Sequence, residues 1–302
     1  MSFVLDTIFS VSFWFSVLRV TTPLIWASLG AAISIESNVI NIAIDGIMLV
    51  AALVGVIISA FTHNLCLALF LAVLAGVGMA CILGYFNLKL KTNIFIGGIA
   101  LNIFASGITI FILYLTTHDK AVSSSLKSLV LPSWDIPLIK NINILGPILS
   151  GQNVLTYFAM VGIILYYFLL YHTKLGLHIR AVGENSEAVR SVGISVVRTK
   201  FIALILSGIF ASLGGVFLSM GYLSFFVKDM TGGRGFIGLA IALMSKNQPV
   251  GLLLSSLLFG ITMQIVNNIK TLRIPSELVE LIPYVVVILV LMFYGIGRKK
   301  KE

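Results

Sequence analysis

Residues 65–86 read LCLALFLAVLAGVGMACILGYF, and this stretch decides the class of fold. It contains no charged residue, and it is as long as the roughly 20 residues that a helix needs to cross a lipid bilayer. The whole chain of 302 residues has the same character, since it is 59% hydrophobic and only 10% charged. A soluble domain carries about 25% charged residues. We therefore predict an all-α polytopic membrane protein, because continuous apolar runs without alternation argue against a β-barrel.

Apolar runs of similar length lie on both sides of this stretch. They predict one transmembrane domain over residues 1–302, with about 8–10 transmembrane helices of which one or two are short or broken. The candidate spans are Val17–Ile35, Ala43–Phe61, Leu65–Phe86, Ile94–Leu115, Val154–Tyr171, Phe201–Leu223, Arg234–Met244, Val250–Ile269 and Leu281–Ile296. Residues 1–16 form either an interfacial helix or a partial span, so the side of the N-terminus stays open.

The longest break between predicted spans covers residues 118–152. It contains Pro132, Trp134, Pro137 and Pro147. Proline and aromatic content of this kind is typical of an ordered loop at the membrane surface. We expect this loop to lie outside the cell.

The net charge of +9 comes from basic residues that gather in short segments between the spans. Short basic segments between spans follow the positive-inside rule, by which cytoplasmic loops carry an excess of Lys and Arg. The positive net charge is therefore not interpreted as a sign of nucleic-acid binding. Lys89 and Lys91 mark one cytoplasmic loop, residues 172–200 mark the largest, and residues 298–301 place the C-terminus in the cytoplasm. An even number of crossings must then separate the last two, so Arg234–Met244 must count as a crossing although it is too short to span alone.

The short segment Arg234–Met244 and the second span share polar, irregular starts. A short helix with irregular ends is tolerated at membrane depth only where protein or a water-filled cavity surrounds it. These two places are therefore candidates for lining a pathway through the membrane, with the residues Asn41, Asp45, Met48, Gly233, Arg234 and Phe236. The alternative is that both places are ordinary interfacial helix caps.

Nothing in the sequence predicts a catalytic, metal or cofactor site. The four histidines lie in or beside predicted loops without ligand spacing: His63, His118, His172 and His178. Cys66 and Cys81 lie inside apolar sequence and are interpreted as packing residues. The chain has no Walker A loop. We expect no enzyme activity of its own, no metal and no cofactor.

Residues 176–194, GLHIRAVGENSEAVRSVGI, form a polar island in this apolar chain. They predict a short helix with a charged face, entered through Gly183 and left through Gly193, since glycine tolerates the backbone angles of a sharp turn. Such a helix can dock in a cleft of another protein while its charges pair at the rim. The residues at helical spacing on it are Glu184, Glu187, Ala188 and Arg190. The alternative is a basic cytoplasmic loop with no partner.

The island resembles the cytoplasmic coupling segment of ABC-importer permeases for branched-chain amino acids, simple sugars and nucleosides, whose pattern is G-x-x-x-R-A-x-G-x-N-x-x-A-A-x-x-x-G-I. Residues 38–52, NVINIAIDGIMLVAA, are similar to the family signature G-V-x-N-I-x-x-E-G-x-M-L-x-G-A. Residues 233–240 match G-R-G-F-x-A-L-A, and residues 247–251 match the closing N-P-x-G. The matches keep their order and spacing over residues 21–251. The chain departs from the patterns at Asn38, Asp45, Ala51, Val189, Ser245 and Gln248, which weakens any transfer of substrate identity.

The resemblance implies the permease subunit of a bacterial ABC importer in the plasma membrane, without a catalytic site of its own. Its partners would be ABC ATPase subunits, a second and related permease subunit, an extracellular solute-binding lipoprotein and membrane lipid, but no nucleic acid polymer. The ATPase-coupling residues would be Gly183, Glu184, Asn185, Glu187, Ala188, Arg190 and Gly193. The signature at residues 38–52, preceded by TPLIWASLG at 22–30, is most similar to the shorter nucleoside-type permeases. Nucleosides or related purines are therefore expected ahead of simple sugars and branched-chain amino acids.

Two alternatives come from other classes of protein. An ion-coupled secondary transporter usually needs ionisable groups deep in the membrane. The candidates are Glu36 and Asp45, and both lie at the ends of predicted spans. The other alternative is a membrane scaffold that transports nothing.

Overall fold

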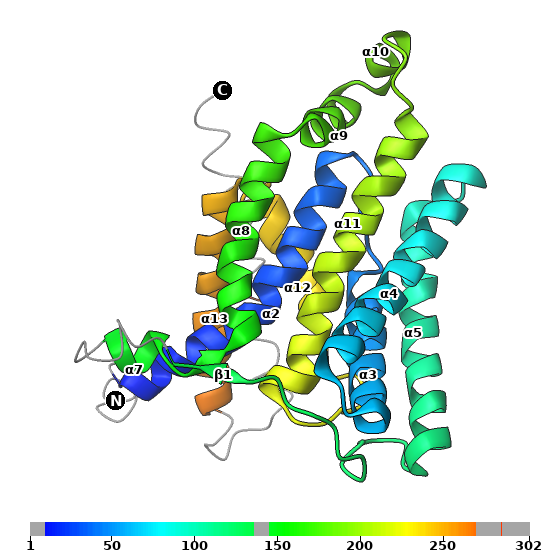
Figure 1. Cartoon of the computed structure of the whole chain (residues 1–302). Helices are drawn as coiled ribbons and strands as arrows, with labels where there is room; N and C mark the ends of the chain where they lie inside the picture. Colours follow the sequence, from blue (N-terminus) through cyan, green and yellow to red (C-terminus); the bar gives the residue numbers. More distant parts are fainter. Residues whose placement is uncertain (1–9, 136–144, 270–284, 286–302) are drawn as a thin grey trace.

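The computed structural model describes residues 10–135, 145–269 and 285 (Figure 1). The predicted span Leu281–Ile296 and the basic residues 298–301 lie outside the described residues. Within the described part, seven helices are long and apolar enough to cross a membrane, and one shorter apolar helix accompanies them. Strand in that part amounts to one antiparallel pair of two-residue strands. The predicted all-α class is confirmed.

Most helices match the predicted spans to within a few residues. The long helices are α2 (Val11–Glu36), α3 (Ile44–Thr62), α4 (Leu65–Gly84), α5 (Ile94–Thr117), α8 (Val154–His172), α11 (Val196–Val216) and α13 (Pro249–Ile269). Two of them continue as π-helical turns, η1 (Tyr85–Lys89) after α4 and η2 (Phe217–Tyr222) after α11. The short elements are α7 (Leu145–Leu149), α9 (Lys174–Glu184), α10 (Ser186–Ser191), α12 (Arg234–Met244), β1 (Ser133–Trp134) and β2 (Gln152–Asn153). The first described helix begins at Val11, so residues 11–16 are continuous with the predicted span Val17–Ile35.

Helix α2 forms the centre of the bundle and packs against α8, α11, α12 and α13. Its most apolar window is 83% buried, whereas that of the peripheral helix α5 is 22% buried. Small residues allow this close packing. A Cβ atom on Gly30 of α2 would lie 2.8 Å from the Ser207 carbonyl oxygen of α11, and one on Gly238 of α12 would lie 2.6 Å from the Cβ of Ala27.

Beyond α2 the chain turns back into the bundle before α3 begins (Figure 1). The side-chain amide of Asn41 donates to the Ser207 hydroxyl at 2.9 Å. Ser207 lies about 16 Å along α11 from Val196, at 1.5 Å per residue. Helix α3 therefore begins inside the bundle, and it runs from there toward the end where η2 lies.

Helix α12 also begins inside the bundle. Its residue Gly235 packs against the backbone of Asp45 at the start of α3. Beyond its other end, the side chain of Asn247 contacts Glu36 at the end of α2. Residues 226–228 pair with residues 121–123, and the chain then returns into the bundle, where Thr231 contacts Asp45. Helix α12 continues from there to the end of α2, so the preceding segment lengthens the path that Arg234–Met244 is too short to make alone.

The two ends of the bundle differ in structure (Figure 1). Helices α9 and α10 cap one end, which we call the α9–α10 end. The strands β1 and β2 lie at the opposite end with α7. The described part of the predicted loop 118–152 is ordered there, because the Ser123 N–H donates to the Phe226 carbonyl at 2.9 Å and Ser133 pairs with Asn153.

Candidate functional site

Asp45, in the first turn of α3, caps the start of α12 from across the bundle. One carboxylate oxygen accepts from the Gly235 N–H at 2.9 Å, and the other accepts from the Thr231 hydroxyl at 2.9 Å. The first N–H groups of a helix lack partners within the helix and carry a partial positive charge. A carboxylate there satisfies a donor and complements that charge.

Asn102 of α5 does the same for the start of α3. Its side-chain carbonyl accepts from the Gly46 N–H at 2.8 Å, and its amide donates to the Ile42 carbonyl at 2.9 Å. Helices α3 and α12 both begin inside the bundle, and we call them the two broken helices. In each, a side chain from another helix accepts a hydrogen bond from a backbone N–H of the first turn. We call residues 42–46 together with 231–235 the mid-bundle junction.

The predicted pathway residues separate into two groups. Asp45 and Arg234 are half-buried at the mid-bundle junction together with Gly233, and Phe236 is 44% exposed on α12. Asn41 and Met48 are fully buried instead, and Gly215 of α11 packs against the Met48 backbone. The starts of both helices lie inside the bundle and not at either of its ends, which favours the pathway interpretation over that of interfacial caps. For the same reason, Asp45 lies deeper than a position at a span end.

The polar island forms two helices rather than the one predicted. Asn185 ends α9, and its side-chain oxygen accepts from the Glu187 and Ala188 N–H groups at 3.1 and 3.0 Å. An asparagine acceptor is among the strongest helix-starting signals. The charged helix therefore begins after Asn185 and not at Gly183, which lies in the last turn of α9. Gly193, with φ of +82°, lies just beyond α10 as predicted.

Gly183 holds α9 against the end of α2. A Cβ at this position would collide with the carbonyl oxygen of Glu36, so only glycine allows this approach. Three buried valines, one each from α9, α10 and α11, form a small core of their own: Val182, Val189 and Val196. Helix α10 is thereby attached to α9 and α11 by apolar packing.

The outer face of α10 is free of contacts within the described chain. The small side chain of Ala188 is exposed there between the charged side chains of Glu187 and Arg190, and Glu184 at the end of α9 is exposed beside them. Val192, just beyond the helix, is 71% exposed. Helix α10 projects from the end of the bundle (Figure 1). A projecting surface of this composition can dock into a partner's cleft with its charges at the rim.

Four elements meet beneath α9 in a polar contact that we call the end joint, made of Glu36, Tyr166, Arg180 and Asn247. The Asn247 amide donates to the Glu36 carboxylate at 3.0 Å, and the Tyr166 hydroxyl donates to the Asn247 carbonyl at 2.7 Å. The Arg180 guanidinium of α9 lies 4.8 Å from the ring centroid of Tyr171 and attracts Glu36 electrostatically. The ends of α2, α8, α9 and α12 are therefore tied together.

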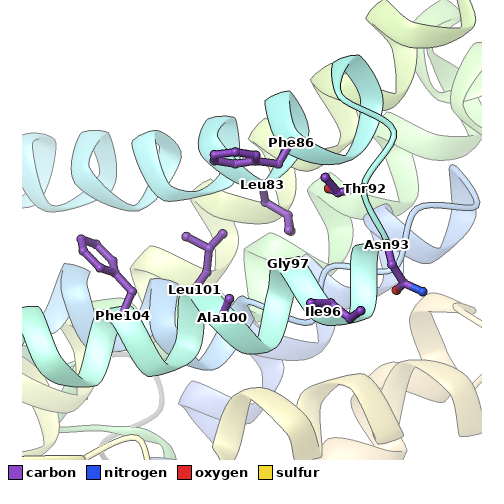
Figure 2. A pocket seen from close by; sticks show the side chains of 9 residues that line it. All are labelled: Leu83, Phe86, Thr92, Asn93, Ile96, Gly97, Ala100, Leu101 and Phe104. Carbon is purple, nitrogen blue, oxygen red and sulfur yellow. The ribbon is translucent and has the colours of Figure 1, made fainter.

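A groove of about 570 Å³ lies between α4, η1 and the start of α5. Figure 2 shows side chains from α4 and η1 facing those of α5 across it, with Thr92 and Asn93 at the connecting turn. Its lining is otherwise apolar, and it contains none of the predicted site residues. It offers little hydrogen bonding to a polar solute. In the described part of the chain, no three His, Cys, Asp or Glu residues gather where they could hold a metal ion.

Comparison with known proteins places these features in a family. A family model described as the branched-chain amino acid transport system permease component matches residues 13–291. The chain belongs to this permease family. The guanosine ABC transporter permease protein NupQ of Bacillus subtilis (strain 168) is 30% identical to this permease, over 91% of its chain and 89% of the relative. The nucleoside ABC transporter permease protein NupC of Lactococcus lactis subsp. cremoris is 29% identical, over 92% and 90%.

Other matches are broader in kind. A putative glucose ABC transporter permease protein of Haloferax volcanii is 29% identical over 81% of this permease and 73% of the relative. A solved structure described as an inward-facing conformation of a putative metal-chelate type ABC transporter shares the fold, with a TM-score of 0.54 and 17% identity over 91% of this chain and 84% of the other. This permease is therefore a subunit of the ABC-transporter type. Neither the secondary transporter nor the scaffold fits its family.

Sequence reasoning missed several residues that build these sites in the permease. Asn102 and Ser207 lie inside apolar spans, and they position the start of α3. An amide or hydroxyl in the middle of an apolar run was the available signal, because a polar group in a membrane helix needs a partner. The contact between Glu36 and Asn247 could not be found in this way, since both residues lie at span ends.

Proposed function

We propose that this permease subunit belongs to a bacterial ABC importer for nucleosides, which uses ATP hydrolysed by separate ATPase subunits. The proposal is supported by relatives of nearly the same length whose names specify guanosine and nucleosides. The protein would lie in the plasma membrane with the α9–α10 end and the C-terminus in the cytoplasm, as the basic segments require.

The observation that carries the coupling role is the projecting helix α10. It offers an exposed docking face, while Val189 on its inner face packs against Val182 of α9 and Val196 of α11. An ATPase bound to α10 would therefore move α9 together with α10. The coupling contacts are assigned to Glu184, Asn185, Glu187, Ala188 and Arg190, while Gly183 and Gly193 shape the backbone.

A continuous set of contacts leads from α10 to the broken helices. Gly183 of α9 packs on the end of α2, and Glu36 there holds Asn247 at the end of α12. The other end of α12 is held by Asp45 at the start of α3. Tilting of α9 would thus move α12 and α3, and this movement would change which side of the membrane the pathway opens to.

The remaining partners follow from the same proposal. A second permease subunit, related to this one, would enclose the pathway, and the exposed residues of the mid-bundle junction would face it. A solute-binding lipoprotein would dock at the opposite end, on the ordered segment that contains β1 and β2. Asp45, Gly233 and Arg234 of the mid-bundle junction would then line the pathway together with Phe236, while Asn41 and Met48 would support it from behind.

The coupling assignment is tested by reversing the chemistry of the docking face. Glu187→Lys together with Ala188→Asp should leave the permease inserted in the membrane, because both side chains are exposed. The variant should fail to co-purify with the ATPase and should show uptake reduced to background. A matched control for ATPase association places the same side chains on the opposite end, as Ser124→Lys with Ser125→Asp, and it should co-purify with the ATPase normally. Normal co-purification of the docking variant would overturn the assignment.

The substrate class is tested separately, with the complete transporter in a host that lacks nucleoside uptake. Radiolabelled guanosine and adenosine should accumulate only when the ATPase can hydrolyse ATP. Accumulation of glucose or of a branched-chain amino acid in their place would refute the nucleoside assignment. Nucleoside uptake driven by an ion gradient in vesicles without ATP would refute the mechanism.

A further inference from the structure

A polar pocket of about 340 Å³ lies between α2, η2 and α13. Its polar lining consists of Ser16, Arg19, Tyr222, Gln264 and Asn267. Arg19 lies about 12 Å along α2 from Val11 and about 26 Å from Glu36, so the pocket lies inside the bundle toward the end opposite α9–α10. Its volume is within the range of about 300–1,000 Å³ that small-molecule sites occupy.

Arg19 is a charged side chain within the span α2, and it makes one side-chain hydrogen bond among the described residues. One of its nitrogens donates to the Tyr222 carbonyl at 2.9 Å, and its guanidinium carbon lies 5.2 Å from the centroid of the Tyr222 ring. A guanidinium has five N–H donors. A charge within a membrane span is expensive, and it usually marks a ligand or ion site.

The backbone of α2 lacks one helical hydrogen bond next to the pocket. Pro23 lies inside α2 and has no N–H to donate to the carbonyl of Arg19, four residues earlier. Just beyond the pocket, α2 and α13 come into close contact where Gly260 packs against Thr21. This contact holds α2 and α13 together beside the pocket.

Helix α13 contributes two side-chain amides. Gln264 is 9% exposed, and its amide donates to the Asn268 side chain at 3.3 Å, which leaves its carbonyl oxygen for another partner. Within the described residues no hydrogen bond engages the side chain of Asn267, one helical turn away on the same face. Polar groups in the interior of a membrane bundle need water or a ligand to satisfy them.

The chemistry of this lining suits a flat, polar molecule that offers hydrogen-bond acceptors and hydroxyls. An arginine fork binds the paired acceptors on the edge of a purine ring, and aromatic and guanidinium planes stack on nucleobases. The amides of Gln264 and Asn267 and the Ser16 hydroxyl suit ribose hydroxyls. We propose that this pocket is a binding subsite for a purine nucleoside within the permease. The proposal rests on the proposed nucleoside function and adds where the solute is held.

The pocket is also connected to the mid-bundle junction through one short segment. Tyr222 and Leu223, which line the pocket, begin the segment that ends at Thr231 and its hydrogen bond to Asp45. A nucleoside held by Arg19 would contact the first residues of this segment. Occupation of the pocket would therefore act on the contact that holds α12 to α3.

The test uses the purified complex of permease and ATPase without the binding protein, with tritiated guanosine and adenosine as probes. Arg19→Ala and Asn267→Ala should each weaken guanosine binding at least about tenfold. Arg19→Ala should also reduce the preference for guanosine over adenosine, because the 6-oxo acceptor of guanosine then loses its donor. Arg19→Lys, which keeps the charge but not the planar fork, should restore affinity without restoring the preference. Two positions outside the pocket serve as controls: Lys127→Ala, which is exposed, and Thr262→Ala, which is half-buried on α13.

The possible outcomes separate this proposal from the function on which it rests. If the complete transporter takes up no nucleoside, the proposed function itself fails. If uptake is intact but the wild-type complex binds no guanosine, or if both pocket variants bind it as tightly as wild type, the subsite is wrong. If Arg19→Ala does not fold, Asn267→Ala decides. Loss of guanosine and adenosine binding in equal proportion in Arg19→Ala would mean a structural role for Arg19 and would also overturn the subsite.

Discussion

At the scale of single residues, side chains from other helices decide where the broken helices begin. Asp45 satisfies the first turn of α12 and Asn102 satisfies that of α3. In a membrane the backbone groups at a helix start have no water to bind, so a side chain must replace it. These two residues therefore control the geometry of the mid-bundle junction, although neither lies in the helix that it caps.

Asn102→Ala should lower the free energy of unfolding by about 1–3 kcal/mol, because it leaves the Gly46 N–H and the Ile42 carbonyl without their partner. The melting temperature of the purified protein in detergent measures this loss. Ser106→Ala, one turn along α5, removes a hydrogen bond to the exposed Asp229 and should cost much less. Equal melting temperatures for the two variants would contradict the role given to Asn102.

At the scale of elements, close approach of helices carries the coupling. The island was predicted as one helix because its charged residues fall at helical spacing, and the spacing alone did not reveal the break. Asn185 introduces that break by offering its side-chain oxygen to the next two N–H groups. Helix α9 is thereby free to lie against α2 while α10 turns outward.

Gly183→Ala tests the contact between α9 and α2. The added methyl group would meet the Glu36 carbonyl, and such overpacking costs about 1–3 kcal/mol. The expected result is a folded permease that still binds the ATPase but moves less solute per ATP hydrolysed, measured in proteoliposomes. Gly107→Ala on α5 is the matched control, since a Cβ there meets nothing within 4 Å. An unchanged ratio of solute to ATP in Gly183→Ala would refute the coupling path.

At the scale of the whole molecule, the two ends of the bundle should face opposite sides of the membrane. In a variant without the native Cys66 and Cys81, Ser124→Cys should react with a membrane-impermeant maleimide in intact cells. Val192→Cys, which is 71% exposed in wild type at the α9–α10 end, should react only after the membrane is opened. Labelling of both positions from outside, or in the reverse order, would contradict the proposed orientation.

The sequence by itself determined the membrane class, the positions of the described long helices and the family. Apolar length, basic loops and local signatures such as residues 233–240 act within short stretches of chain, so they can be found without a fold. It also indicated that Asp45 and Arg234 belong to unusual helix starts. Asp45 and Gly235 are far apart in the sequence, however, and their hydrogen bond exists only because α2 and α11 bring the two starts to one depth.

Tertiary structure alone decided which polar groups share a site. It buried Asn41 and Met48, brought Asn247 to Glu36, and gathered Arg19, Tyr222 and Gln264 around one pocket from three different elements. Each of these groups can be satisfied locally or by a distant partner, and the sequence does not distinguish the two. The packing of small residues fixes the choice, because it sets which helices approach closely enough for polar groups to meet.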